Sequence, residues 1–364
     1  MKKLFIFLCT ICTAMHLHAQ NPFARYKVEH YDSKNGMPTD FILNAYQTKE
    51  GFIWMNTFNG YLRFDGKQFV NFNSNNTPLL KTDNNTSLFT ETEDSTLWLP
   101  TGNGLLSYKN GVFKRYLADF SNIFLRGKTK TGQLIFSSTE TNKKNMLLVF
   151  NPSTYQYNKI NDKDFLNIIS NSGTAKKAEI DNWFTKNGKI IHKDKDGIWQ
   201  TIAEKEGIQS TMLFSRDDFF VDTRNRVWLN SGYGIFLWNG NRFNLFPGME
   251  KVVIPGSSPS FGYMVEDHQQ GIWASMNNTL AYLPYNETRF HVFPKEYLSI
   301  QTLHNITIDR EQNIWVATDR GLFKLSKTKV VNYAEVEGIQ NNRVSSISEV
   351  SNNKFIITTP TDQL

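Results

Sequence analysis

The sequence contains very little cysteine, and all of it lies near the N-terminus. Of 364 residues only Cys9 and Cys12 are cysteine, and both fall within an apolar run that has the layout of an export signal. A mature chain without cysteine has no disulfide framework, no thiol nucleophile and no thiolate metal site. We therefore expect a hydrophobic core alone to hold the fold, and a mature chain of about 345 residues is long enough for one large domain.

Long hydrophobic runs are missing beyond that N-terminal stretch. Lys2 and Lys3 precede the apolar run, which ends at Met15, and the small residue Ala19 follows. Such a run is too short to span a bilayer comfortably and is typical of a secretory signal peptide. We expect residues 1–19 to be a signal peptide, the mature chain to be exported, and any membrane attachment to come from segments outside this chain.

Clusters of like charge are also missing. The formal net charge is +6, but the longest basic runs are pairs, at residues 143–144 and 176–177. Nucleic-acid binding requires a denser basic face, so we expect no nucleic-acid partner. A hydrophobic content of 40% with 14% aromatic residues argues against disorder.

What the chain does contain is a tryptophan repeat. Five tryptophans follow a Leu, Ile or Val, with a spacing of 44 between the first two and of 45 and 42 between the last three: Trp54, Trp98, Trp228, Trp273 and Trp315. In four of the five units a hydroxyl residue stands three positions later, and a glycine six positions later: Gly60, Gly104, Gly234 and Gly321. Because all five indoles occupy one place in the repeat, we interpret them as packing residues between neighbouring units.

Each unit contains about four short strands separated by turns. Asp65-Gly66, Asn110-Gly111 and Asn239-Gly240 are strong hairpin signals, because these residues tolerate positive φ. Four strands in 40 to 50 residues are typical of one blade of a β-propeller. We therefore predict an all-β chain that forms a seven-bladed β-propeller of four-stranded blades over residues 20–337.

Two of the seven predicted blades are degenerate. Phe136 takes the tryptophan position in the third, and His192 or a neighbour takes it in the fourth. An eighth repeat begins at Gly338, and Ile356 falls 41 residues after Trp315. We interpret residues 338–364 as an incomplete eighth repeat, which is the start of a further blade or of a second propeller.

The repeat resembles that of the two-component regulator propeller family. The matching residues of the first unit are Gly36-Met37-Pro38, Glu50-Gly51, Ile53-Trp54, Thr57 and Gly60-Tyr61-Leu62. The resemblance covers essentially the whole mature chain and recurs in at least five units. It implies the periplasmic sensor region of a histidine kinase or hybrid two-component protein, in which two propellers precede a membrane helix and a cytoplasmic output. It also implies a polysaccharide breakdown product as ligand, and the output module lies outside this chain.

Catalytic and metal-binding patterns are absent from the sequence. The five histidines of the mature chain show no His-x-His or His-x-x-x-His spacing, and no nucleophile elbow or phosphate-binding glycine loop occurs. Acidic residues near the tryptophans recur with the repeat, so we interpret them as turn caps: Asp94, Asp222, Asp267 and Asp309. We expect no catalytic residue, no metal, no cofactor and no enzymatic activity in this chain.

Three functions remain open at this stage. The first is a sensory propeller whose oligosaccharide ligand alters the docking of a homodimer. The second is an exported propeller hydrolase or lyase that acts on glycans, and the third is a scaffold that binds a protein partner. Loop residues Arg126, Arg216 and Tyr263 were candidates for contact with a ligand, but the repeat does not identify the binding residues.

Overall fold

The computed structural model describes fifteen stretches of the chain, and every structural statement below concerns these residues. They are 22–83, 87–129, 131–140, 145–160, 183–186, 189–193, 196, 198–202, 219–231, 234–248, 262–276, 278–298, 300–328, 345–351 and 354–358. The signal peptide predicted at residues 1–19 and Arg216 lie outside them. Two compact units are distinguished: Val28–Ser326, and a second made of Met1–Lys27 with Lys327–Leu364.

Three four-stranded antiparallel sheets follow the predicted blade pattern. In each, the strands are hydrogen-bonded in chain order and the tryptophan lies on the second strand. Their strands are β2 (Asn44–Gln47), β3 (Ile53–Thr57), β4 (Gly60–Phe64) and β5 (Phe69–Phe72); β16 (Phe219–Val221), β17 (Val227–Ser231), β18 (Gly234–Trp238) and β19 (Phe243–Leu245); and β20 (Met264–Glu266), β21 (Ile272–Met276), β22 (Thr279–Leu283) and β23 (His291–Val292).

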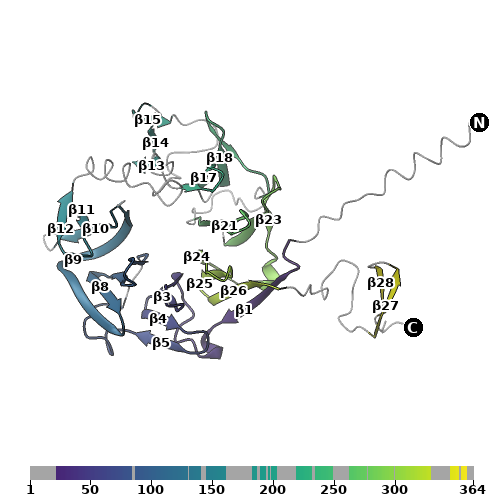
Figure 1. The fold of residues 1–364 in the computed structure, drawn as a ribbon, viewed down its shortest axis with the longest axis horizontal. Helices are drawn as coiled ribbons and strands as arrows, with labels where there is room; N and C mark the ends of the chain where they lie inside the picture. Colours follow the sequence, from purple (N-terminus) through teal and green to yellow (C-terminus); the bar gives the residue numbers. More distant parts are fainter. Residues whose placement is uncertain are drawn as a thin grey trace, which may run out of the picture. The chain divides into compact units, whose positions relative to one another are not determined.

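A fourth sheet joins the two ends of the unit Val28–Ser326. Its order is β1-β26-β25-β24, so the N-terminal strand β1 (Tyr26–Tyr31) completes a sheet made from β24 (Leu303–Ile308), β25 (Ile314–Thr318) and β26 (Gly321–Lys327). This sheet lies beside β2–β5, because the Ile42 amide donates to the Thr318 carbonyl at 2.9 Å. The first and last tryptophan units are therefore neighbours (Figure 1).

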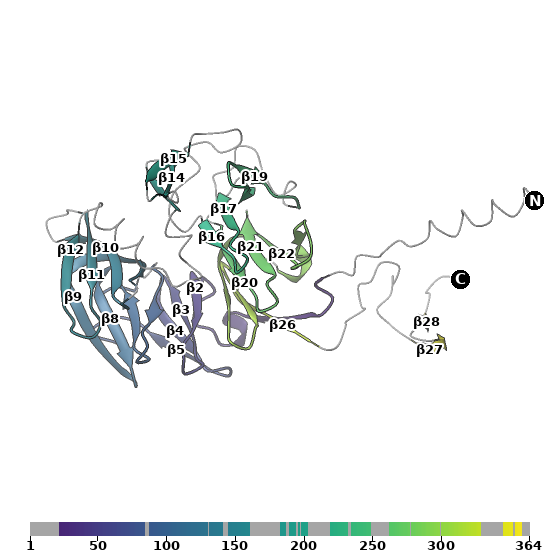
Figure 2. The ribbon, with the colours of Figure 1, turned by 45° about the horizontal axis from the view of Figure 1, so that its top comes forward.

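The second and third predicted blades are not separate sheets. Their strands form one seven-stranded sheet in the order β12-β11-β10-β9-β8-β7-β6. The bounds are β6 (Thr90–Glu91), β7 (Leu97–Pro100), β8 (Asn103–Lys109), β9 (Val112–Lys128), β10 (Leu134–Glu140), β11 (Asn145–Phe150) and β12 (Tyr157–Ile160). Figures 1 and 2 show β9 as the long strand of this sheet.

Strand β9 explains the difference from the prediction. Its first half pairs with β8 and its second half with β10, so it is both the last strand of one unit and the first of the next. The strand bends where Leu117 and Asn122 adopt positive φ, of 51° and 49°. A bend thus replaces the expected loop, and the ladder stays continuous. Within the described residues, the prediction of seven separate four-stranded blades in a closed ring is not met.

The strands of the fourth predicted unit bear on which residue takes its tryptophan position. Its described strands are β13 (Trp183–Lys186), β14 (Lys189–Lys193) and β15 (Trp199–Ile202), paired in that order. Trp183 pairs with His192 as Trp54 pairs with Arg63, so His192 lies on the strand opposite the tryptophan position. Trp183 stands 47 residues after Phe136 and 45 before Trp228, which fits the repeat. The spacing therefore favours Trp183 as the tryptophan position of this unit over the predicted His192 or a neighbour of it.

The remaining elements are short. Strands β27 (Ser346–Ser351) and β28 (Lys354–Thr358) form a hairpin in the second unit, and Ile356 lies on the second of them. Two 3-10 turns, η1 (Ser33–Asn35) and η6 (Lys295–Tyr297), are the helical segments among the described residues. None of the described helices is long and apolar enough to cross a membrane.

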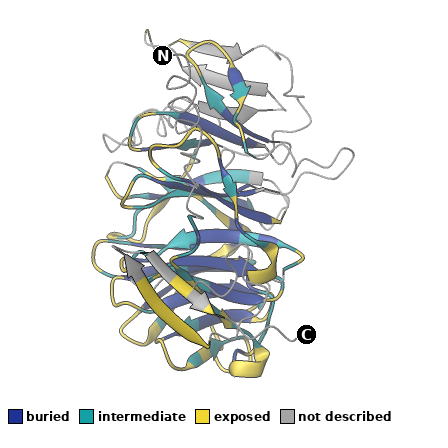
Figure 3. Cartoon of the chain, turned by 90° about the vertical axis from the view of Figure 1, so that its right-hand side faces the viewer, coloured by how far each residue is buried: buried dark blue, intermediate teal, exposed yellow. Residues whose placement is uncertain are grey.

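Part of the core lies between neighbouring sheets, and part lies within single sheets. All five residues of β3 and all five of β25 are buried, so these second strands are covered on both faces. Figure 3 shows that buried residues gather in the strands and exposed ones in the turns. One cluster joins Ile42, Met55 and Leu62 of the first sheet to Trp315 and Leu322 of the last. Burial of such side chains contributes about 1.5–3 kcal/mol each, so stability depends on sheet-to-sheet packing.

Candidate functional site

The repeat tryptophans are buried; Trp54, Trp228 and Trp315 pack against a neighbouring sheet, and Trp98 packs within the seven-stranded sheet. Trp54, Trp98, Trp228, Trp273 and Trp315 are at most 3% exposed. The ring of Trp54 on β3 lies 4.7 Å from that of Tyr108 on β8, in the next sheet. The ring of Trp315 on β25 lies 6.4 Å from that of Phe64 on β4. These indoles fill the space between units and present no free ring face to a ligand.

The hydroxyl and glycine positions shape the turn between the second and third strands. Thr57, Thr101 and Thr318 donate their hydroxyls to the carbonyls three residues later, those of Gly60, Gly104 and Gly321, at 3.1, 2.7 and 2.7 Å. These three glycines have φ of 99°, 96° and 110°, a region that disfavours other residues. Gly234 differs, because a Cβ there would lie 2.6 Å from Leu245 Cδ1. Turn geometry and close packing account for these positions.

The recurring acids serve the same architecture. Asp309 Oδ2 accepts the indole N–H of Trp315 at 2.7 Å, and Asp222 Oδ2 accepts that of Trp228 at 3.0 Å. Burial raises the pKa of Asp222, and the hydrogen bond from Trp228 opposes that rise. In the unit of Trp273, Asp267 accepts from the hydroxyl of Tyr282 at 3.0 Å. These carboxylates hold aromatic donors and turn amides, which explains them without catalysis.

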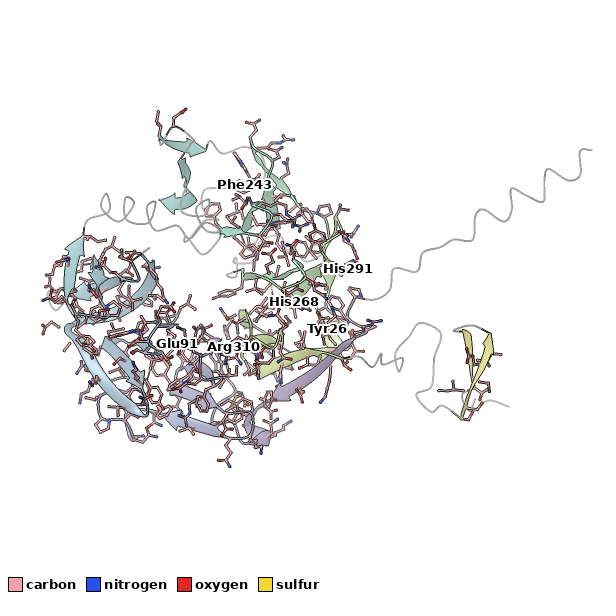
Figure 4. All side chains as sticks on the ribbon, viewed as in Figure 1. Tyr26, Glu91, Phe243, His268, His291 and Arg310 are labelled. Carbon is pink, nitrogen blue, oxygen red and sulfur yellow. The ribbon has the colours of Figure 1, made fainter. Side chains whose placement is uncertain are left out.

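Polar side chains at the end of the first strands join successive sheets. We call this edge, where the first strand of each sheet ends, the end side. Gln47, Glu91 and Glu266 occupy the same place, seven residues before a tryptophan, and each accepts a backbone amide from the preceding sheet at 2.8 Å: those of Arg310, Lys49 and Thr223. Figure 4 labels Glu91, His268 and Arg310 in this region. These polar groups are occupied by contacts between sheets.

The opposite edge, where the first strands begin, carries a different set of residues. We call it the start side, and the turn between second and third strands lies there too. Phe41 precedes β2, Phe58 lies in the turn after β3, and His304 lies near the start of β24. The ring of Phe41 lies 4.8 Å from that of Phe58 and 4.5 Å from that of His304. We call these three rings the aromatic ledge, and it crosses from the first tryptophan sheet to the last.

The aromatic ledge is partly open to solvent. The side chain of Phe58 is 49% exposed, whereas Phe41 and His304 are half-buried. Burial lowers the pKa of His304, and the charge of Asp319 opposes that change. The imidazole is therefore uncharged at neutral pH. Its Nε2 is buried without a hydrogen-bond partner among the described residues, so His304 acts here as a flat ring surface.

Polar groups surround the aromatic ledge. Asp319 Oδ1 accepts the amides of Gln301 and Thr302 at 3.1 and 2.8 Å, and Asn278 Oδ1 accepts that of Leu303 at 3.3 Å. These bonds fix a carboxylate and an amide next to His304. Small-molecule sites combine apolar and aromatic side chains with a few placed polar groups, and the aromatic ledge with its polar neighbours has this composition. This part of the start side is our candidate binding site.

The other candidates from the sequence lie elsewhere. Arg126 is exposed on β9, and its Nε donates to the hydroxyl of Ser137 at 2.8 Å. Tyr263 precedes β20, and its amide donates to the hydroxyl of Ser275 at 3.0 Å. The described part of the chain holds no group of three or more His, Cys, Asp or Glu side chains placed to bind a metal ion. The aromatic ledge was not predicted from the sequence, because His304 lies more than 240 residues after Phe41 and Phe58.

The sequence matches no protein-family description and no curated protein. Its fold is similar to the extracellular domain of the putative hybrid two-component system BT3049 from B. thetaiotaomicron, with a TM-score of 0.60 and 16% identity over 92% of this chain and 47% of that one. The corresponding domain of BT4673 gives a TM-score of 0.59 and 15% identity over 92% and 44%. The chain thus spans about half the length of these structures.

A lyase has a similar fold. Virginiamycin B lyase from Staphylococcus aureus gives a TM-score of 0.53 and 14% identity over 83% of this chain and 99% of that one. At such identities the likeness concerns the fold alone. The chain therefore has an all-β fold of the kind found in extracellular domains of two-component systems and in this lyase.

Proposed function

We propose that this chain is the ligand-sensing propeller region of an exported two-component signalling protein, with the start side as its recognition surface. The supporting observation is the combination of a sensor-like fold over 92% of the chain with an exposed aromatic ledge that the repeat does not require. The proposal includes a ring of blades closed by β1, export by residues 1–19 to the periplasm, and an output module carried by other segments of the signalling protein.

The proposed ligand is a glycan-derived oligosaccharide. The start side offers ring faces beside a carboxylate and amide groups, and sugars present both apolar C–H faces and hydroxyls. Signal transfer would follow from a change in the docking of a homodimer when the ligand binds. Residues on the end side are already engaged between sheets, so a ligand there would have to break existing hydrogen bonds.

A thermal-shift screen of the purified full chain against defined oligosaccharides tests the proposal. A ligand that binds only the folded state raises the melting temperature as its concentration increases. We expect at least one oligosaccharide to produce a dose-dependent rise, together with a change in sedimentation if dimer docking responds. If no glycan shifts the melting temperature and a periplasmic protein does, the chain is a protein-binding scaffold.

Lyase chemistry is the second candidate, because a lyase has a similar fold. His304 of the aromatic ledge and Asp319, whose charge acts on it, are the ionisable groups that this second candidate would use. Incubation of the same oligosaccharides with the purified chain, followed by product analysis, distinguishes the two functions. Turnover that Asp319→Asn abolishes would favour the enzyme, whereas binding without products favours the sensor.

A further inference from the structure

The aromatic ledge occupies positions at which the repeat units differ. Phe58 stands four residues after its tryptophan, and the same position holds small or polar residues in the other units: Gly102, Gly232, Asn277 and Asp319. Phe41 stands thirteen residues before its tryptophan, where the others have Asn85, Ser215, Ser260 and Thr302. A residue shared by all units is explained by the fold. A large aromatic found in one unit only, on the surface, requires another explanation.

Packing does not explain Phe58. Its side chain is 49% exposed at a turn where Gly102 closes the equivalent turn of β7 and β8. An exposed phenyl ring forgoes most of the stabilisation that burial gives. The ring is nevertheless held in place by Phe41, whose ring lies 4.8 Å away at an interplanar angle of 32°. An apolar ring that is fixed before binding loses little conformational freedom when a ligand stacks on it.

Asp319 and Asn278, which we call the polar rim, restrict the class of ligand that the aromatic ledge can bind. Asp319 and Asn278 are fixed beside His304 by hydrogen bonds to the backbone of residues 301–303. Carboxylate and amide oxygens accept hydrogen bonds from hydroxyl groups. A carboxylate at the rim also repels an anionic ligand. The rim therefore favours a neutral sugar over a uronic acid or a sulfated sugar.

We propose that the Phe58–Phe41–His304 ledge is a stacking platform for one pyranose ring of a neutral oligosaccharide, with Asp319 and Asn278 as acceptors for its hydroxyls. This inference rests on the proposed glycan-sensing function and assigns it to particular residues. Phe58 is its outermost and most exposed ring, so it carries the largest share of the contact with the sugar. Phe41 contacts Phe58, and His304 contacts Phe41 at an interplanar angle of 41°, so the three tilted rings form one continuous aromatic contact.

Ligand-observed saturation-transfer NMR and titration calorimetry on the purified full chain test this assignment. The probes are unsubstituted gluco-, manno-, galacto- and xylo-tetrasaccharides, together with a tetragalacturonide as the anionic comparison. We expect a neutral tetrasaccharide to bind, and Phe58→Ala to weaken its binding about tenfold, because aromatic contacts contribute on this scale. Phe58→Trp keeps a flat ring and should retain the affinity.

The matched control is Tyr155→Ala. Tyr155 is 54% exposed and stacks on Tyr116 with ring centroids 5.0 Å apart, so it has the same kind of surface stacking away from the aromatic ledge. Its removal should leave binding unchanged, and circular dichroism verifies that both variants fold. Equal binding by Phe58→Ala and the unmodified chain overturns the platform but leaves glycan sensing in place. If the tetragalacturonide alone binds, the neutral-sugar assignment is wrong, and if no saccharide binds, the platform and the glycan ligand both fail.

Discussion

The end side and the start side of the sheets differ in the residues that each adds to the common repeat. At the end side, residues seven positions before the tryptophans recur as Gln47, Glu91 and Glu266 and make the same bond to the preceding sheet. At the start side, Phe41, Phe58 and His304 occur once each and leave a ring surface in solvent. Both edges carry repeated residues that maintain the architecture. The start side carries in addition the three single rings, which are available for recognition.

The largest expected effect concerns the turn that carries Phe58. Gly60 and Gly66 both have positive φ, of 99° and 95°. A Cβ on Gly60 would collide with the Phe72 carbonyl oxygen, whereas one on Gly66 would meet no atom within 4 Å. We expect Gly66→Ala to lower the free energy of unfolding by about 1 kcal/mol through backbone strain alone, and Gly60→Ala by about 3 kcal/mol. Urea denaturation of both variants measures the difference, and equal losses would contradict the close packing at Gly60.

The second largest effect concerns the side chain that accepts the hydrogen bond from the indole N–H, which is a carboxylate in one unit and a hydroxyl in another. Asp309, 5% exposed, accepts from Trp315, whereas the hydroxyl of Thr92 accepts from Trp98 at 3.2 Å. Loss of the carboxylate leaves a buried indole N–H and turn amides unpaired. We expect Asp309→Ala to cost about 2 kcal/mol and Thr92→Ala about 1 kcal/mol in the free energy of unfolding. A larger loss for Thr92→Ala would mean that the carboxylate is not the stronger support.

A smaller effect tests the contact between the first and last tryptophan sheets. Gln47 accepts from the amide and Nε of Arg310 at 2.8 and 3.2 Å and donates to Glu311 at 2.7 Å. We expect Gln47→Ala to lower the free energy of unfolding by about 1 kcal/mol. Gln68→Ala, at an exposed turn of the same sheet, is the control and should change it by less than about 0.5 kcal/mol. Equal values would show that these bonds add nothing to the contact between the two sheets.

The sequence predicted those parts of the fold that the repeat encodes. Spacing identified the sheets that contain Trp54, Trp228, Trp273 and Trp315, and the hydroxyl residue and the glycine supported all of them except that of Trp273. Spacing could not reveal that β9 continues from one unit into the next. The bend of β9 depends on the positive φ of Leu117 and Asn122, and a leucine seldom adopts positive φ, so its residue type gives no sign of the bend. It also did not reveal that β1 completes the last sheet, since this pairing joins opposite ends of the unit.

Irregular units limited the prediction further. In the fourth unit the glycine follows Trp183 by five residues and not six, so this unit departs from the pattern of the others. The aromatic ledge was beyond the reach of spacing, because the contact between Phe41 and His304 depends on the last sheet lying beside the first. A comparison of equivalent positions across the units would have marked Phe58 as an exception, although it could not have shown which rings it meets.

The smallest expected effect is a pH dependence at the aromatic ledge. Burial lowers the pKa of His304 below its ordinary value, with Asp319 opposing, so the unfolded state binds the proton more readily than the folded state. Stability should therefore fall as the pH drops below about 6.5, the ordinary pKa of histidine, and reach its full loss below the folded pKa. His304→Phe keeps a ring and removes this proton. The difference in free energy of unfolding between His304→Phe and the unmodified chain should shift in favour of the variant between pH 7.5 and pH 5. A difference that stays constant over this range would show that the imidazole titrates as it does in the unfolded chain, and the ledge would then be more hydrated than its packing against Phe41 indicates.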